Sequence, residues 1–194
     1  MEAARDLFIQ KGIQGTTLGD IATEARVTRA TIYQYFSSQS DIAWAILEEN
    51  FEAVKETMWQ PLEINGTGYE RLAAFFASFL VYWAQHPEHF RFLAQFDTMY
   101  AGQQEVERLL GVTQRTFGGV PGHVVEVIHK GMEDGSLRSN LNPQLTAAAI
   151  INMVIAMMVR LEAHRTSVAV EYGYPSEQIF EEAYQLLLQG LRAS

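Results

Sequence analysis

The chain has 194 residues, of which 48% are apolar, contains no cysteine, and carries a formal net charge of −9. The apolar content argues against intrinsic disorder, and the lack of cysteine excludes disulfide bonds and thiolate metal sites. The longest apolar runs, residues 72–84 and 147–159, each cover thirteen residues and are broken by Ser78 and Asn152. They are shorter than the roughly 20 residues of a membrane span, so we expect a soluble cytoplasmic protein without membrane contacts.

Three short helices are predicted near the N-terminus. The first covers residues 2–11. The second begins at Thr17, which can form a capping box with Asp20 three residues later. The third begins at Thr28, its N-cap, after a brief turn around Arg26. Two helices joined by such a turn form a helix-turn-helix unit, whose second helix enters the major groove of DNA.

The remaining sequence shows 3.6-residue periodicity and no sustained strand-like alternation. Helices are predicted over residues 41–59, 69–85, 88–99, 103–131 (interrupted at 118–122), about 143–164, and 176–191. The connection over residues 166–175 is left undefined. We therefore predict an all-α protein of about nine helices, with residues 1–42 as a DNA-binding domain (the head) and residues 43–194 as a ligand-binding and dimerisation domain (the body).

The third helix has the chemistry of a DNA-reading helix. Ile32 and Phe36 are four residues apart and share one face, which we expect to pack on the two preceding helices. The other side groups then point outward or flank that face: Arg29, Ala30, Thr31, Tyr33, Gln34 and Tyr35. Such side chains can bond guanine, adenine and phosphate or touch thymine methyls. Although the protein is acidic, residues 1–40 hold four basic and four acidic groups, so the net charge of −9 lies entirely in the rest of the chain.

The head resembles the N-terminal domain of the TetR/AcrR family of one-component transcriptional regulators, through the residues GIQGTTLGDIATEARVTRATIYQYFSSQSDI. Further on, GMEDGSLRSNLNP before an apolar helix is similar to the family's turn into its eighth helix. The resemblance implies that Thr17 contacts phosphate and that Tyr33 and Tyr35 contact the DNA backbone. It also implies that four residues face bases: Arg29, Ala30, Thr31 and Gln34. From their positions in the turn and at the helix start, Arg26 and Thr28 are added as phosphate contacts.

Three departures from the family pattern predict weaker and less salt-sensitive DNA binding than is usual. Arg26 stands where the family's turn usually has glycine, at a cost on the order of 1 kcal/mol if the turn needs a positive φ. Gly19 and Gln39 occupy positions that are often basic. The sequence also begins inside the first helix, without the basic arm that usually precedes it in the family.

The last helix carries a wide apolar stripe, which predicts a homodimer. With the 145–164 helix it can form a four-helix bundle across a two-fold axis; an intramolecular core helix is the alternative. The predicted interface residues are Asn152, Phe180, Ala183, Leu187 and Leu191. Asn152 interrupts the most apolar helix, so we expect its amide to bond across the dimer axis or to a ligand. Arg160 and Glu162 are expected to be exposed.

The middle of the body is rich in aromatic and methionine side chains, which can line a pocket for an apolar ligand. For any single one of these residues, a place in the core is the alternative. The predicted pocket lies among the fourth to eighth helices and is lined by Met58, Phe79, Trp83, Phe96, Tyr100, Met153 and Met157.

No catalytic or metal site is predicted, and no cofactor is expected. His86 and His89 lack a clear third ligand, and His123 and His129 do not share a helix face. The segment GGVPG lacks the lysine and the preceding strand of a phosphate-binding loop. The sequence therefore argues against an enzyme.

The predicted function is a homodimeric repressor that binds double-stranded operator DNA and is released by a small, largely hydrophobic effector. An activator or a co-repressor-dependent regulator of the same fold is not distinguished by the sequence. The alternative from another class is a dimeric small-molecule-binding protein whose DNA binding is weak or lost.

Overall fold

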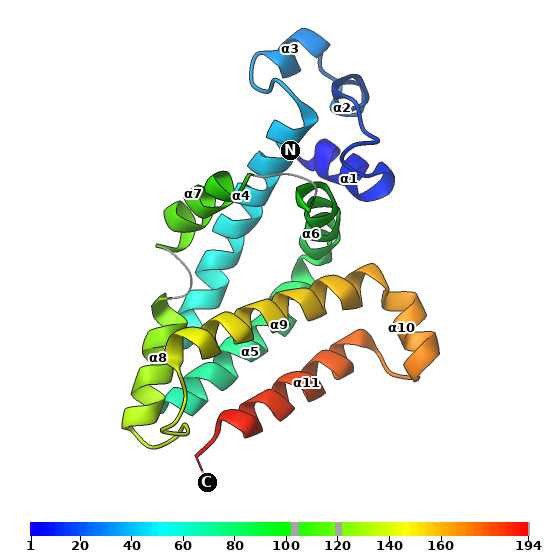
Figure 1. The fold of residues 1–194 in the computed structure, drawn as a ribbon. Coiled ribbons are helices and arrows are strands. Elements are labelled where there is room, and N and C mark those ends of the chain that lie inside the picture. The colour runs from blue at the N-terminus through cyan, green and yellow to red at the C-terminus, as the bar shows by residue number, and fades with distance from the viewer. Residues whose placement is uncertain (102–104, 119–121, 194) are drawn as a thin grey trace.

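The computed structural model describes residues 1–101, 105–118 and 122–193. Over these residues the chain is all-α, as predicted, and carries a helix-turn-helix head (Figure 1). The helices are α1 (Glu2–Lys11), α2 (Leu18–Glu24), α3 (Arg29–Tyr33), α4 (Gln39–Trp59), α5 (Gly68–Gln85), α6 (Pro87–Tyr100), α7 (Val106–Phe117), α8 (Gly122–Glu133), α9 (Pro143–Ala163), α10 (Arg165–Tyr172) and α11 (Ser176–Leu191), with a 3₁₀ turn at Gln60–Leu62.

The described residues form eleven α-helices, two more than the predicted nine. The segment predicted as one interrupted helix is two helices, α7 and α8, because Gly118 adopts a left-handed φ of 70° and ends α7. Of that segment, residues 103–104 and 119–121 lie outside the described residues. The connection predicted as undefined contains α10, which ends at Gly173 with φ 76°.

Local capping interactions set the starts of the helices. Thr17 and Asp20 form the predicted capping box at the start of α2, since the Thr17 hydroxyl accepts from the Asp20 amide and the Asp20 carboxylate accepts from the Thr17 amide. The Thr28 side chain caps α3 by accepting from the Thr31 amide. Ser38 caps α4, which therefore begins two residues before the predicted position.

Figure 1 shows the head, α1 to α3, at one end of the molecule, with the long helix α4 leading from it into the body. The core adjoining the head extends beyond the three head helices. Buried residues of α1 and α2 pack with the first half of α4, the second half of α6, and α7. Within this cluster Trp44 meets Phe96 edge to face with ring centroids 4.9 Å apart.

A second buried cluster fills the body between α5, α8, α9 and α11. It includes Phe75, Phe76, Tyr82 and Trp83 of α5, each at most 1% exposed. Since α6 packs against α1, α4, α5 and α9, it touches both clusters and joins the head to the body.

Helix α9 is apolar on more than its buried side. It is 21 residues long and contains an 18-residue window with a mean hydropathy of 1.7, so by length and composition alone it could cross a membrane, yet only 28% of that window is buried. Leu145, Met153 and Ile155 are 68%, 55% and 37% exposed. The helix therefore presents an exposed apolar face. Figure 1 shows that α9 runs beside α11, against which it packs.

Candidate functional site

The turn between α2 and α3 is a complete Schellman motif. The Val27 amide donates to the Ala22 carbonyl at 2.9 Å, and the Arg26 amide donates to the Thr23 carbonyl at 3.2 Å. This pattern requires a left-handed residue at the position of Arg26, whose φ is 56°, the one positive value at a non-glycine residue in the described chain. The positive φ considered from the sequence is therefore present, at an arginine.

Helix α3, the second helix of the helix-turn-helix, is short and packs through its inner side on the core that α1 and α2 share with α4 and α6. Ile32 and Phe36 are half-buried and pack against the core that adjoins the head. Tyr33 and Tyr35 are 61% and 75% exposed. Among the other side chains predicted to face bases or phosphates, Thr31 is half-buried. The remaining ones are exposed: Thr17, Arg26, Thr28, Arg29, Ala30 and Gln34.

Arg29 does not extend straight out from α3. Its guanidinium lies against α2 so closely that a Cβ at Gly19 would come within 2.6 Å of Nη2 and 2.9 Å of Cζ. The missing side chain at Gly19 therefore leaves the space that the Arg29 guanidinium occupies. Although position 19 has glycine in place of the basic residue often found there, Arg29 of α3 supplies a positive group beside α2.

The same guanidinium lines a cleft of about 460 Å³ between α2, α3 and the start of α4, together with Thr17, Tyr33, Ser37 and Ser38. Hydrogen bonds from Thr17 hold the pKa of the Asp20 carboxyl below its ordinary value, with smaller contributions from Lys11 and Arg29. The cleft therefore gathers one guanidinium and several hydroxyl groups at the open side of the helix-turn-helix.

The seven residues predicted to line an effector pocket are not brought together. Met58, Phe79 and Trp83 are packed in the body core. Phe96 is buried with Tyr100 against it in the other cluster. Met153 lies on the exposed face of α9.

A different apolar cavity, of about 400 Å³, opens between the end of α9, α10 and the start of α11. Of the predicted residues it includes Met157, and its other lining residues are Arg160, Leu161, Val168, Tyr172, Tyr174 and Ile179. A volume of this size lies within the range of small-molecule pockets, ~300–1,000 Å³. This cavity was not predicted from the sequence, because α10, which supplies Val168 and Tyr172 to its wall, was not predicted.

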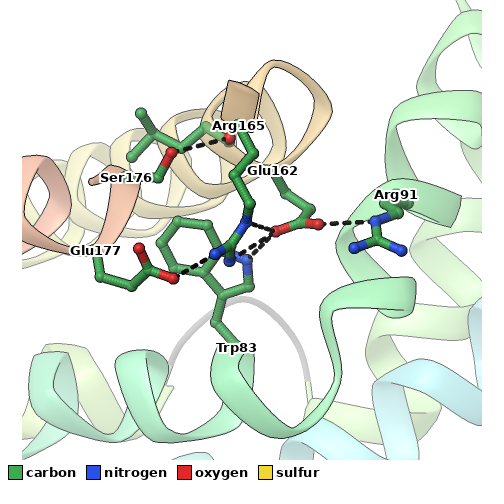
Figure 2. Close-up of polar contacts among 7 residues, drawn as sticks. Trp83, Arg91, Glu162, Arg165, Ser176 and Glu177 are labelled. Carbon is green, nitrogen blue, oxygen red and sulfur yellow. Dashed lines mark hydrogen bonds and ion pairs between the residues drawn. The ribbon is translucent and has the colours of Figure 1, made fainter. Parts of the chain in front are cut away.

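Glu162, expected to be exposed, is instead the centre of a buried polar cluster (Figure 2). Its side chain is 1% exposed and accepts hydrogen bonds from Trp83 Nε1 and Arg91 Nε, both at 2.7 Å, and from Arg165 Nε at 3.1 Å. Arg165 also bonds Glu177 of α11 and lies over the Trp83 ring. Glu162 is buried because α5, α6 and α10 supply the side chains that bond it, and α11 supplies Glu177, the second partner of Arg165. The sequence signal that could have predicted this burial is a glutamate at the end of the most apolar helix, three residues before an arginine with which it can pair.

The predicted dimer residues divide into inward-facing and outward-facing sets. Phe180 and Leu191 are 1% and 5% exposed within the single chain, so both pack in the body core. Ala183 and Leu187 are half-buried. Asn152 is exposed rather than buried, and its amide donates to the Ala148 carbonyl one turn earlier at 2.8 Å.

The comparisons with known proteins agree with this geometry. Residues 1–46 match the model of the bacterial regulatory proteins of the tetR family. The transcriptional repressor KstR2 of Mycolicibacterium smegmatis is 21% identical over 210 residues, which cover 100% of this chain and 89% of that protein. The transcriptional regulator AcrR of Shigella flexneri is 42% identical over 53 residues, 26% of this chain and 25% of that protein.

Among solved structures, the regulator FadR from Bacillus subtilis in complex with stearoyl-CoA superposes with a TM-score of 0.73. It is 19% identical, and the match covers 98% of this chain and 97% of that one. At this identity the likeness supports the fold alone. Residues 1–46, the helix-turn-helix head, therefore match the tetR family of bacterial regulatory proteins, and the rest of the chain shares the all-α fold of this solved regulator.

Proposed function

We propose that the chain is a homodimeric repressor that leaves its operator when a small, largely hydrophobic effector binds the body. The observation that carries the proposal is the exposed outer side of α3, held by Ile32 and Phe36 and adjoining the Arg29 cleft. An exposed recognition helix with arginine, glutamine and tyrosine side chains suits base and phosphate contacts in the major groove. Two relatives, KstR2 and DhaR, are named as transcriptional repressors, which supports the repressor assignment.

The open face of α9 and α11 supports the homodimer. Met153 on α9 and Leu186 on α11 are 55% and 60% exposed, and the two helices pack beside each other. Exposed apolar side chains on neighbouring helices are typical of a subunit interface, and two helices from each subunit would complete a four-helix bundle. Two copies of α3 would then reach two half-sites of one operator.

The cavity between α9, α10 and α11 is our proposed effector site. Its walls are methionine, aromatic and aliphatic, with Arg160 as the cationic group. An apolar chain attached to an anionic group fits this lining, and stearoyl-CoA in the FadR complex has that chemistry. The effector class for this chain is therefore an acyl compound with a negatively charged end.

The Glu162 cluster provides a physical route from this cavity to the head. Leu161, which lines the cavity, precedes Glu162, and Arg165 is the first residue of α10. Glu162 bonds Arg91 on α6, and α6 packs directly on α1 and α4. An effector that favours a different α10 position would shift α6 and change the spacing of the two recognition helices.

DNA binding is tested with duplexes selected by the full-length protein from a random library, followed by gel shift at low salt. We expect the Arg29→Ala, Tyr33→Ala double variant to lose binding, while Arg138→Ala, an exposed arginine of the body, binds like the wild type. Failure of the wild type to select any duplex would contradict the repressor assignment and favour the alternative, a dimeric small-molecule-binding protein.

Dimerisation and effector binding have separate tests. In sedimentation experiments at micromolar concentration, Leu186→Glu should yield monomers, whereas Leu110→Glu, at a residue 58% exposed on α7, should stay dimeric. A monomeric wild type would overturn the homodimer. Acyl-CoA compounds should change tryptophan fluorescence saturably and lower operator affinity, and Met157→Trp should block both effects by filling the cavity.

A further inference from the structure

The junction between α5 and α6 gathers three metal-ligating side chains. His86 caps the end of α5, and Glu88 and His89 stand in the first turn of α6. One ligand atom from each residue lies within 4.8 Å of the other two. Among the residues that the structure describes, this is the one group of three such side chains found close enough to share an ion. The third ligand that the sequence did not reveal is therefore Glu88, which the helix start places between the two histidines.

Two of the three donor pairs are spaced close to what a tetrahedral ion needs, and the third pair, between the two histidines, lies within 4.8 Å. Glu88 Oε1 lies 3.5 Å from His86 Nδ1 and 3.7 Å from His89 Nε2. Two ligands about 2.0–2.1 Å from a tetrahedral zinc lie roughly 3.3 Å from each other. The same distances exceed the 2.7–3.2 Å of a normal N–H···O hydrogen bond, ~2.9 Å at the mode. Glu88 thus faces two ring nitrogens at a separation better suited to a shared cation than to direct hydrogen bonds.

A buried tyrosine already orients one of the ligands. Tyr82 OH lies 2.6 Å from His89 Nδ1, and Tyr82 is 1% exposed. Metal-ligating histidines commonly engage their second ring nitrogen in such a hydrogen bond, which fixes the tautomer and leaves the other nitrogen free for the ion. In the tautomer that the site requires, His89 Nδ1–H donates to the Tyr82 hydroxyl oxygen, and Nε2, the nitrogen facing Glu88, keeps its lone pair for the ion.

We propose that His86, Glu88 and His89 bind a divalent transition-metal ion of the Zn²⁺ class, with Tyr82 as the residue that positions His89. Two imidazoles and one carboxylate match the ligand chemistry of zinc sites that keep a fourth position for water. The side chains are 40%, 34% and 11% exposed for His86, Glu88 and His89, so solvent can supply that water. The two imidazole rings lie nearly parallel, 14° apart, and the more exposed His86 ring turns about its soft terminal torsion to complete the site.

The test uses full-length protein without a histidine tag, treated with a chelator and dialysed. Co²⁺ is titrated by visible absorption, which reports tetrahedral coordination, and Zn²⁺ by calorimetry. We expect one ion per chain with micromolar or tighter affinity. His86→Ala and His89→Ala should each weaken Zn²⁺ binding at least 100-fold. Tyr82→Phe should weaken it about 10- to 100-fold, the usual effect of removing such a partner.

His129→Ala and His164→Ala are the matched controls, because both residues are exposed histidines elsewhere on the body. They should bind Zn²⁺ within twofold of the wild type. Two results would overturn the proposal: wild-type binding weaker than millimolar, or binding that the control substitutions reduce and the His86 and His89 substitutions do not.

A folding defect in a variant is separated from the loss of a ligand by circular dichroism and by a measurement on the wild type. X-ray absorption of the zinc-loaded wild-type protein should show two imidazoles in the coordination shell. One imidazole or none would also overturn the site, whatever the variants do.

Discussion

Arg26 is the residue at which the strain of the head can be measured directly. Its φ of 56° lies in the left-handed region, and the Schellman bonds on either side of it hold the backbone there. For a residue with a Cβ, this conformation lowers the free energy of unfolding by about 1–2 kcal/mol through steric strain. Glycine removes that strain but has greater freedom in the unfolded chain, which costs about 0.4–1 kcal/mol. Arg26→Gly should therefore raise the free energy of unfolding by about 0.5–1 kcal/mol.

The control is Arg26→Ala, which keeps the Cβ and its strain but removes the guanidinium. Urea unfolding of the three proteins should give Arg26→Gly the highest midpoint, with wild type and Arg26→Ala close together. In thermal unfolding the gain should be on the order of 1–4 °C for a chain of this length. The order of the urea midpoints reports stability when each variant keeps the same slope of free energy against urea.

DNA binding should move in the opposite direction from stability. If the exposed Arg26 guanidinium neutralises a phosphate, both variants leave that phosphate without its cation, and the slope of log affinity against log salt becomes shallower by about 0.9. Glycine at this position then stabilises the head while weakening its binding to DNA. An Arg26→Gly protein no more stable than Arg26→Ala would refute the reasoning, because the strain at this residue would then be negligible.

Three further predictions concern single side chains. Glu162→Ala should lower the free energy of unfolding by about 1–3 kcal/mol, because it leaves the buried Trp83 N–H without an acceptor, whereas the exposed Glu171→Ala should change it little; equal losses in urea unfolding would contradict the cluster. Hydrogen bonding, first from the Ser37 hydroxyl, lowers the pKa of the Asp41 carboxyl, so its stabilising contribution is present above about pH 4 and lost as the pH falls through the lowered pKa. Asp41→Asn should accordingly flatten the acid side of the stability–pH profile, and an unchanged profile would count against the assignment. Gly19→Ala should displace the Arg29 guanidinium and reduce DNA affinity in gel shifts without unfolding the protein, and unaltered affinity would mean that the cleft geometry is not needed for binding.

The sequence alone determined the elements whose causes are local. Thr17 and Asp20 lie three residues apart and cap α2 by themselves, and Thr28 caps α3 in the same way. The four-residue spacing of Ile32 and Phe36 fixed which side of α3 turns inward. These features are decided within one or two helical turns, so pattern and capping chemistry are enough to predict them.

The tertiary structure decided which side chains meet across the fold. Phe180 points into the core and Asn152 to the surface. The positions of α11 and α9 relative to α5 determine which side of each helix is buried, and the apolar stripe in the sequence does not. Glu162 is buried only because Trp83, Arg91 and Arg165 come to it from three other helices. The Arg29 guanidinium likewise rests on Gly19 through a contact between two helices. Burial and pairing of this kind depend on neighbours distant in the chain, and helix periodicity carries no information about them.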